Sequence, residues 1–123
     1  MYKFVLYEYI DNSLFPSAII NSKEKDIRYL ENNLPKALKD ERFKKELIYF
    51  KGYKNSMLRS SETLGFRIDV CTHGKSEVDP EEPWEYGMYD EYYRIEEIDN
   101  YHLKNFIENY RLKGFNRLEK IVI

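Results

Sequence analysis

Residues 77–99 combine acidic and aromatic side chains in a pattern that suits the binding of a basic macromolecule. Ten carboxylates are accompanied by a single base, Arg94, so the segment has a net charge of −9 while the other 100 residues carry +7. Trp84 and four tyrosines are interleaved with these acids. Carboxylates attract a positively charged partner over long range, and Trp and Tyr supply rigid contact area after docking. The pattern therefore predicts a surface that captures a cationic protein.

The predicted function is that of a small non-enzymatic binding protein of the inhibitor or immunity type. Its acidic, tyrosine-rich surface would block a basic site on a partner protein such as a nuclease or toxin. Association would be fast and salt-sensitive, and desolvation of the aromatic side chains would follow. The expected partner-binding residues are Asp79, Glu81, Glu82, Trp84, Glu85, Tyr86, Tyr89, Asp90, Glu91 and Tyr92.

The same segment has a second interpretation, in which it serves the fold alone. The tyrosines would pack in the core, and the acids would protect an edge strand from aggregation or be neutralised by a nearby basic helix. The two interpretations differ in whether the rings and carboxylates of residues 77–99 face the solvent together. The bases of that helical region are Lys36, Lys39, Arg42, Lys44 and Lys45.

Cys71 and His73 raise the alternative of a small enzyme. If the strand that contains Cys71 continues to His73, this spacing puts a thiol and an imidazole on the same face. Asp79 is close in sequence. A cysteine nucleophile needs a base within hydrogen-bond reach, which His73 or His102 would have to supply through a tertiary contact. Structural zinc needs four ligands, whereas the chain has one cysteine and two histidines. Nucleotide-binding and hydrolase motifs such as G-x-G-x-x-G, Walker A and G-x-S-x-G are missing from the sequence. We therefore expect no catalytic site, metal or cofactor.

Residues 23–59 raise a further alternative, a nucleic-acid accessory protein. This region holds 11 bases and 6 acids. Tyr29, Tyr49 and Tyr53 could stack on nucleobases while the basic side chains contact phosphates. Mixed charges of this kind are also common on solvated helix faces. We therefore expect the partner to be a protein and not a nucleic acid.

The bulk composition predicts a single cytoplasmic domain spanning residues 1–123. A chain of this length can bury a core without disulfides, and its lone cysteine cannot form an internal bridge, which favours a reducing compartment. No apolar run approaches the roughly 20 residues that span a bilayer, and the first residues lack signal-peptide features. We expect no membrane association, while the many tyrosines also permit a homodimer.

Six segments have the composition of strands. The first is apolar on both faces, which is typical of a strand inside a sheet. The second begins beside Pro16, which cannot donate to a ladder, so we expect it at a sheet edge. A short helical turn precedes the third. In the fourth, Arg67, Asp69 and Cys71 form the face opposite the apolar one. The predicted strands span residues 2–10, 17–20, 46–53, 64–72, 89–98 and 116–123.

Two segments have helical periodicity. Asn21 or Ser22 is expected to cap the first, which runs to about Lys39 and is kinked or restarted at Pro35.

The second helix begins after Asp99 or Asn100 and ends at Gly114. The element order predicts an α+β fold, with a mostly antiparallel sheet of five or six strands and both helices packed on one face. A ferredoxin-like split βαβ core is one specific version.

Overall fold

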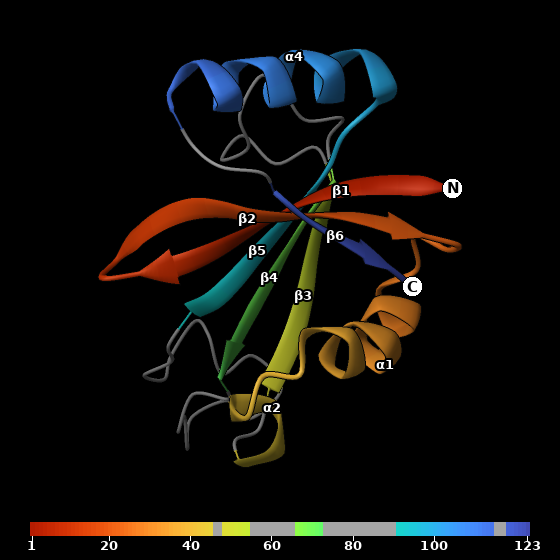
Figure 1. Ribbon diagram of the computed structural model, residues 1–123. Helices are drawn as coiled ribbons and strands as arrows, with labels where there is room; N and C mark the ends of the chain where they lie inside the picture. Colours follow the sequence, from red (N-terminus) through yellow and green to blue (C-terminus); the bar gives the residue numbers. More distant parts are fainter. Residues whose placement is uncertain (46–47, 55–65, 73–90, 115–117) are drawn as a thin grey trace.

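The computed structural model (Figure 1) describes residues 1–45, 48–54, 66–72, 91–114 and 118–123. Within these ranges six strands form one sheet, so the predicted α+β class and mostly antiparallel sheet are confirmed. The strands are β1 (Tyr2–Ile10), β2 (Ser13–Ser22), β3 (Ile48–Lys54), β4 (Phe66–Thr72), β5 (Glu91–Glu97) and β6 (Glu119–Val122), and the helices are α1 (Ile27–Leu38), α2 (Arg42–Lys45) and α4 (Asn100–Leu112).

The strand order is β3-β4-β5-β1-β2-β6. Neighbouring strands are antiparallel except β2 and β6, which are parallel. β1 lies in the middle of the sheet, as its two apolar faces predicted. Because β1 and β2 separate β5 from β6, the connection through α4 crosses over two strands. The ferredoxin-like arrangement is not confirmed.

A tight turn at Asp11 and Asn12 joins β1 to β2. Both residues have positive φ, 51° and 63°, as a type I′ turn requires, and Asn and Asp tolerate this region better than other non-glycine residues. The register shifts after Leu6, which lies opposite Ala18, so that Tyr7 faces Pro16. The hairpin therefore contains a bulge at Ser17.

One face of the sheet packs against α1. Leu30 and Leu34 of the helix are fully buried, and they pack against strand side chains that include Phe4 and Ile20. Full burial of one such leucine contributes on the order of 1.5–3 kcal/mol. This larger core therefore holds α1 against the sheet.

The opposite face packs against α4. Val5 alternates with Phe4 along β1, and its side chain lies in a second, smaller core with Ile19, Leu103 and Phe106. Figure 1 shows α4 above the sheet and α1 below it. The prediction that both helices share one face is therefore wrong. A strand that is apolar on both faces needs cover on both sides, and one helix on each face provides it.

The predicted N-terminal cap is correct for α4 and wrong for α1. Asp99 caps α4 as predicted by accepting a hydrogen bond from the backbone N–H of His102 at 2.7 Å. Gly114 follows that helix with a φ of 78°. The cap of α1 is Asp26 instead of Asn21 or Ser22, because β2 continues through Ser22 before the helix begins.

Pro16 and Pro35 are accommodated without interrupting their elements. α1 runs from Ile27 through Pro35 to Leu38. β2 is not an outermost strand, but β6 pairs only with the stretch from Ala18 to Asn21. Pro16 thus lies where β2 has no partner on that side among the described residues.

Within the described ranges, no helix combines the length and apolar character needed to cross a membrane.

Candidate functional site

Most of the predicted partner-binding residues lie outside the described part of the chain. The two that lie inside it are at the start of β5, where Glu91 is half-buried and Tyr92 is buried. His73 of the alternative enzyme site is also outside the described residues. The predicted residues that the structure does not describe are Asp79, Glu81, Glu82, Trp84, Glu85, Tyr86, Tyr89 and Asp90.

The Tyr92 and Tyr93 rings both pack into the core on the α1 side of the sheet. They expose 8% and 6% of their surface. Successive side chains of a regular strand point to opposite faces, but here β4 pairs Val70 with Tyr93 and Cys71 with Glu91. Tyr92 is thus the extra residue of a bulge, which turns both rings inward. The predicted contact set requires Tyr92 to lie on the surface. Its ring is buried instead, so the prediction is wrong for this residue.

Arg42 of α2 covers these two rings. Its guanidinium carbon lies 4.2 Å from the centroid of the Tyr92 ring and 5.3 Å from that of Tyr93. The Phe43 ring stacks on Tyr93 with centroids 6.1 Å apart. These contacts attach the short helix α2 to the beginning of β5.

Asp40 completes a cluster of charged and aromatic side chains around Arg42. α1 ends at Leu38, and Lys39 follows it with a φ of 53°. Asp40 then accepts a hydrogen bond at 2.9 Å from the backbone N–H of Arg42, the first residue of α2. The guanidinium donates to both carboxylate oxygens of Asp40, and the Tyr93 hydroxyl donates to one of them at 2.6 Å. Glu8 lies 3.7 Å from the same guanidinium.

The pKa values of this cluster follow from these contacts. The hydrogen bond from Arg42 is the main cause that lowers the pKa of Asp40 to about 2. Burial, followed by the Asp40 carboxylate, raises the pKa of Tyr93 above the ordinary tyrosine value. Around neutral pH the cluster therefore holds an ionised aspartate, an arginine and a neutral phenol.

A second group of charged side chains lies on the other face of the sheet, across β4 and β5. Arg67 donates to Asp69 through Nε at 2.9 Å and Nη2 at 2.6 Å, and both residues are 5% exposed. Arg94 donates to the Tyr9 hydroxyl at 2.8 Å, while its Nε lies 3.6 Å from Asp69. Glu96, opposite Arg67 in the register, is 4% exposed.

This second group was foreseen only in part. Alternation along residues 64–72 predicted that Arg67 and Asp69 share a face, and the structure confirms this and shows that the two side chains are also hydrogen-bonded to each other. Their burial was not predicted, because a period of two does not distinguish a solvated face from a covered one. Buried charges are costly unless they are paired and hydrogen-bonded, as Arg67 and Asp69 are. Burial also raises the pKa of the neighbouring Tyr9 hydroxyl to about 12.

Cys71 lies at the end of this same face and does not resemble a nucleophile. It is 2% exposed, and burial, reinforced by Asp69 and Glu91, raises the pKa of its thiol to about 12. His102 is directed elsewhere, because its Nδ1 lies 2.8 Å from the Asp99 carboxylate at the start of α4. Across the described ranges, no three His, Cys, Asp or Glu side chains are grouped closely enough to hold a metal ion.

Several bases of residues 23–59 pair with acids of the same fold. Besides Arg42, Lys44 lies 3.0 Å from Glu41, and Lys25 lies 4.0 Å from Glu97 of β5. Residues 77–90 hold six acids and no base.

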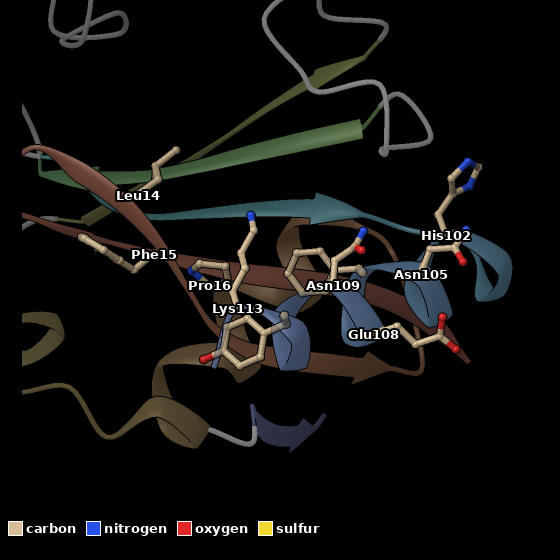
Figure 2. Close-up of a pocket in the computed structure, with 10 residues that line it drawn as sticks. Leu14, Phe15, Pro16, His102, Asn105, Glu108, Asn109 and Lys113 are labelled. Atoms are coloured by element: carbon tan, nitrogen blue, oxygen red, sulfur yellow. The ribbon is translucent and has the colours of Figure 1, made fainter. Parts of the chain in front are cut away.

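A groove between β2 and α4 was not predicted. It has a volume of about 840 Å³, and its walls include Phe15 and Pro16 of the strand, Asn105 and Asn109 of the helix, and Lys113 directly after the helix. Figure 2 shows these side chains along the strand and along one side of the helix. The sequence contains no local signal for this groove, because it depends on how α4 crosses the sheet.

Comparison with protein-family models finds no match, and no curated protein or solved structure is similar enough to count as a relative. Function must therefore be inferred from the residues of this chain.

Proposed function

We propose that this chain is a small non-enzymatic binding protein of the inhibitor or immunity type. Its acidic segment, residues 77–91, blocks a basic site on a partner protein such as a nuclease or toxin. The segment holds seven carboxylates and no base, together with Trp84, Tyr86 and Tyr89. Tyr92, whose ring is buried, is left out of the contact set.

The observation that carries this proposal is the charge of the segment, and the pairing of several described bases within the fold supports it. Arg42 is engaged by Asp40 and Glu8, and Lys44 by Glu41. Arg94, the base next to the start of β5, is engaged by Tyr9 and lies close to Asp69. A run of seven carboxylates without a base favours association with a cationic surface from outside.

The alternative functions have less support. A thiol with a pKa of about 12 is almost entirely protonated near neutral pH, so Cys71 is a poor nucleophile. A phosphate-binding surface needs unpaired bases, whereas Arg42, Lys44 and Lys25 of the basic region face carboxylates of the same chain.

Charge reversal tests the proposal. The variant Glu81→Lys/Glu82→Lys/Glu85→Lys is compared with the wild type for retention of basic proteins from a lysate of the source cells, eluted in a salt gradient. The matched control is Glu24→Lys/Glu31→Lys/Glu119→Lys, which has the same change in charge at three exposed glutamates outside the acidic segment. We expect the wild type and the control to retain the same basic protein, and the triple variant to bind it at least about tenfold more weakly, through slower association.

Two outcomes contradict the proposal. Equal retention by all three chains means that the carboxylates of residues 81–85 do not contact a partner. Loss of the folded circular dichroism spectrum in the triple variant alone means that these residues serve the fold. Either result removes the acidic segment as a binding surface.

A further inference from the structure

The groove between β2 and α4 has an apolar wall and an aromatic floor. Pro16 pairs with Tyr7, whose ring contacts Phe106 of α4, so Pro16 lies on the face of the sheet that this helix covers. Leu14, two residues earlier in β2, shares that face, and both residues line the groove. The rings of Phe106 and Tyr110 also line it and stack with centroids 6.4 Å apart. The groove therefore suits a molecule with aliphatic side chains.

The strand side of the groove also has backbone groups that point away from β1. The two-residue turn of the hairpin makes Ile10 and Ser13 a hydrogen-bonded pair. Such pairs alternate with non-hydrogen-bonded pairs along an antiparallel ladder, so the N–H and C=O of Leu14 point outward. In the ranges that the structure describes, β6 pairs with β2 only from Ala18 onward. Leu14 can therefore donate to and accept from a bound chain.

The helix side of the groove has two amide side chains one turn apart, Asn105 and Asn109. Neither side chain has a hydrogen-bond partner within the described part of the chain, whereas Asn33 of α1 donates to the Tyr29 carbonyl. Asparagine is a weaker helix former than alanine or lysine, so helix stability does not explain the pair. Each carboxamide has a donor and an acceptor, which match the C=O and N–H of a peptide unit.

The spacing of these asparagines fits an extended chain. Four residues of a helix rise about 6 Å, and two residues of an extended chain span about 6.6 Å. A peptide that lies along α4 thus brings every second peptide unit beside Asn105 or Asn109. Lys113 repeats the spacing once more, directly after the helix (Figure 2).

The charged side chains around the groove favour a carboxylate at the Lys113 end. Lys113 has no ion-pair partner among the residues that the structure describes. Glu108 also lines the groove, but it directly precedes Asn109 and is turned about 100° away from it around the helix axis. Glu108 therefore lies at the rim. At the other end of the groove, the His102 imidazole is held by the Asp99 carboxylate, 2.8 Å from Nδ1.

We infer that the groove between β2 and α4 binds an extended peptide segment of another protein, with apolar residues at alternate positions and a carboxylate beside Lys113. Asn105 and Asn109 hold successive peptide units, the strand wall contacts the apolar side chains, and Lys113 sets the direction of the chain. Recognition through main-chain hydrogen bonds, with side chains read at alternate positions, is a recurrent mode of peptide binding. This site goes beyond the proposed function and uses no residue of the acidic segment.

Two synthetic octapeptides that differ in one charge test this inference. Both alternate leucine with serine and have blocked ends, but the last residue is glutamate in one and lysine in the other. Nuclear magnetic resonance spectra of the ¹⁵N-labelled wild type follow binding. We expect the glutamate peptide to shift the side-chain amide signals of Asn105 and Asn109, and to bind at least about fivefold more tightly than the lysine peptide. N-methylation of its central peptide units should weaken binding at least about tenfold.

The variant Asn105→Ala/Asn109→Ala removes the amides and keeps the helix, because alanine is the best helix former. It should bind the glutamate peptide at least about tenfold more weakly than the wild type does. The matched control is Asn32→Ala/Asn100→Ala, which changes two exposed asparagines outside the groove and should bind as the wild type.

The variant Lys113→Glu tests the charge and should reverse the preference, so that the lysine peptide binds more tightly. Its control is Lys104→Glu, which has the same change in charge on α4 outside the groove and should keep the wild-type preference. Circular dichroism of each variant shows that the comparison is made on folded protein.

Several results overturn the inference. They are the absence of shifts with either peptide, equal binding of the N-methylated peptide, unchanged binding by Asn105→Ala/Asn109→Ala, and an equal effect of either control variant. A wild-type dimer in sedimentation experiments that Asn105→Ala/Asn109→Ala dissociates also overturns it, because a second copy of the chain then fills the groove.

Discussion

Replacement of Asp40 by asparagine should remove a pH-dependent part of the stability. In the folded protein the Asp40 carboxylate accepts hydrogen bonds from Arg42 and Tyr93, which favour its ionised form. Its pKa is lowered from 3.8 to about 2, with the hydrogen bond from Arg42 as the largest cause. Asparagine has nearly the same shape but no charge, so the variant tests the charge itself.

The size and sign of the effect follow from linkage. A pKa lowered by almost two units corresponds to about 2 kcal/mol. Arg42 is about one third exposed, and solvent screening reduces the expected contribution to about 1–2 kcal/mol. Because the folded pKa of Asp40 is the lower one, this stability is present above the unfolded value of 3.8 and is lost as the pH falls through about 2.

Urea denaturation at several pH values measures this effect. The free energy of unfolding of the wild type should exceed that of Asp40→Asn by about 1–2 kcal/mol near pH 6, and the difference should almost vanish near pH 2. Asp11→Asn in the exposed turn is the matched control for the loss of one aspartate elsewhere in the chain. A difference that is constant across this pH range, or that grows as the pH falls, would refute the assignment of a lowered pKa to Asp40.

Three further predictions concern buried groups. Tyr93→Phe removes the hydroxyl that donates to Asp40 and should lower the free energy of unfolding by about 1 kcal/mol; an unchanged urea midpoint would contradict that hydrogen bond. Asp69→Ala leaves the buried Arg67 without its carboxylate and should cost about 3–5 kcal/mol, whereas a loss below about 1 kcal/mol would show that Arg67 does not depend on it. Cys71, with a thiol pKa of about 12, should resist alkylation at pH 8 in the folded protein and react promptly in urea; rapid labelling of the folded chain would show an accessible thiolate.

Local sequence signals predicted most of the elements. The short helical turn before β3, the cap of α4 at Asp99 and the helix stop near Gly114 depend on side chains and backbone conformation within one or two turns. The start of α1 was placed too early, because β2 continues to Ser22 and Asp26 provides the cap. Pairing of β2 with β1 favoured extended backbone at residues that have helix-capping side chains.

Less of the candidate site could be predicted from the sequence. The acidic and aromatic composition of residues 77–99 is visible in the sequence, but the orientation of each side chain is not. The bulge beside Cys71 turns both Tyr92 and Tyr93 inward, whereas simple alternation would send one of them outward. The groove between β2 and α4 also depends on which residues the neighbouring elements leave uncovered.

The sequence by itself determined the α+β class, the central position of β1 and the shared face of Arg67 and Asp69. These features follow from side-chain periodicity, which is a local property of the chain. Only the tertiary structure decided that α1 and α4 cover opposite faces and that the charges on β4 and β5 are buried. The physical reason is that strand order, register and crossovers depend on contacts between residues far apart in the sequence, and a local pattern is compatible with several such arrangements.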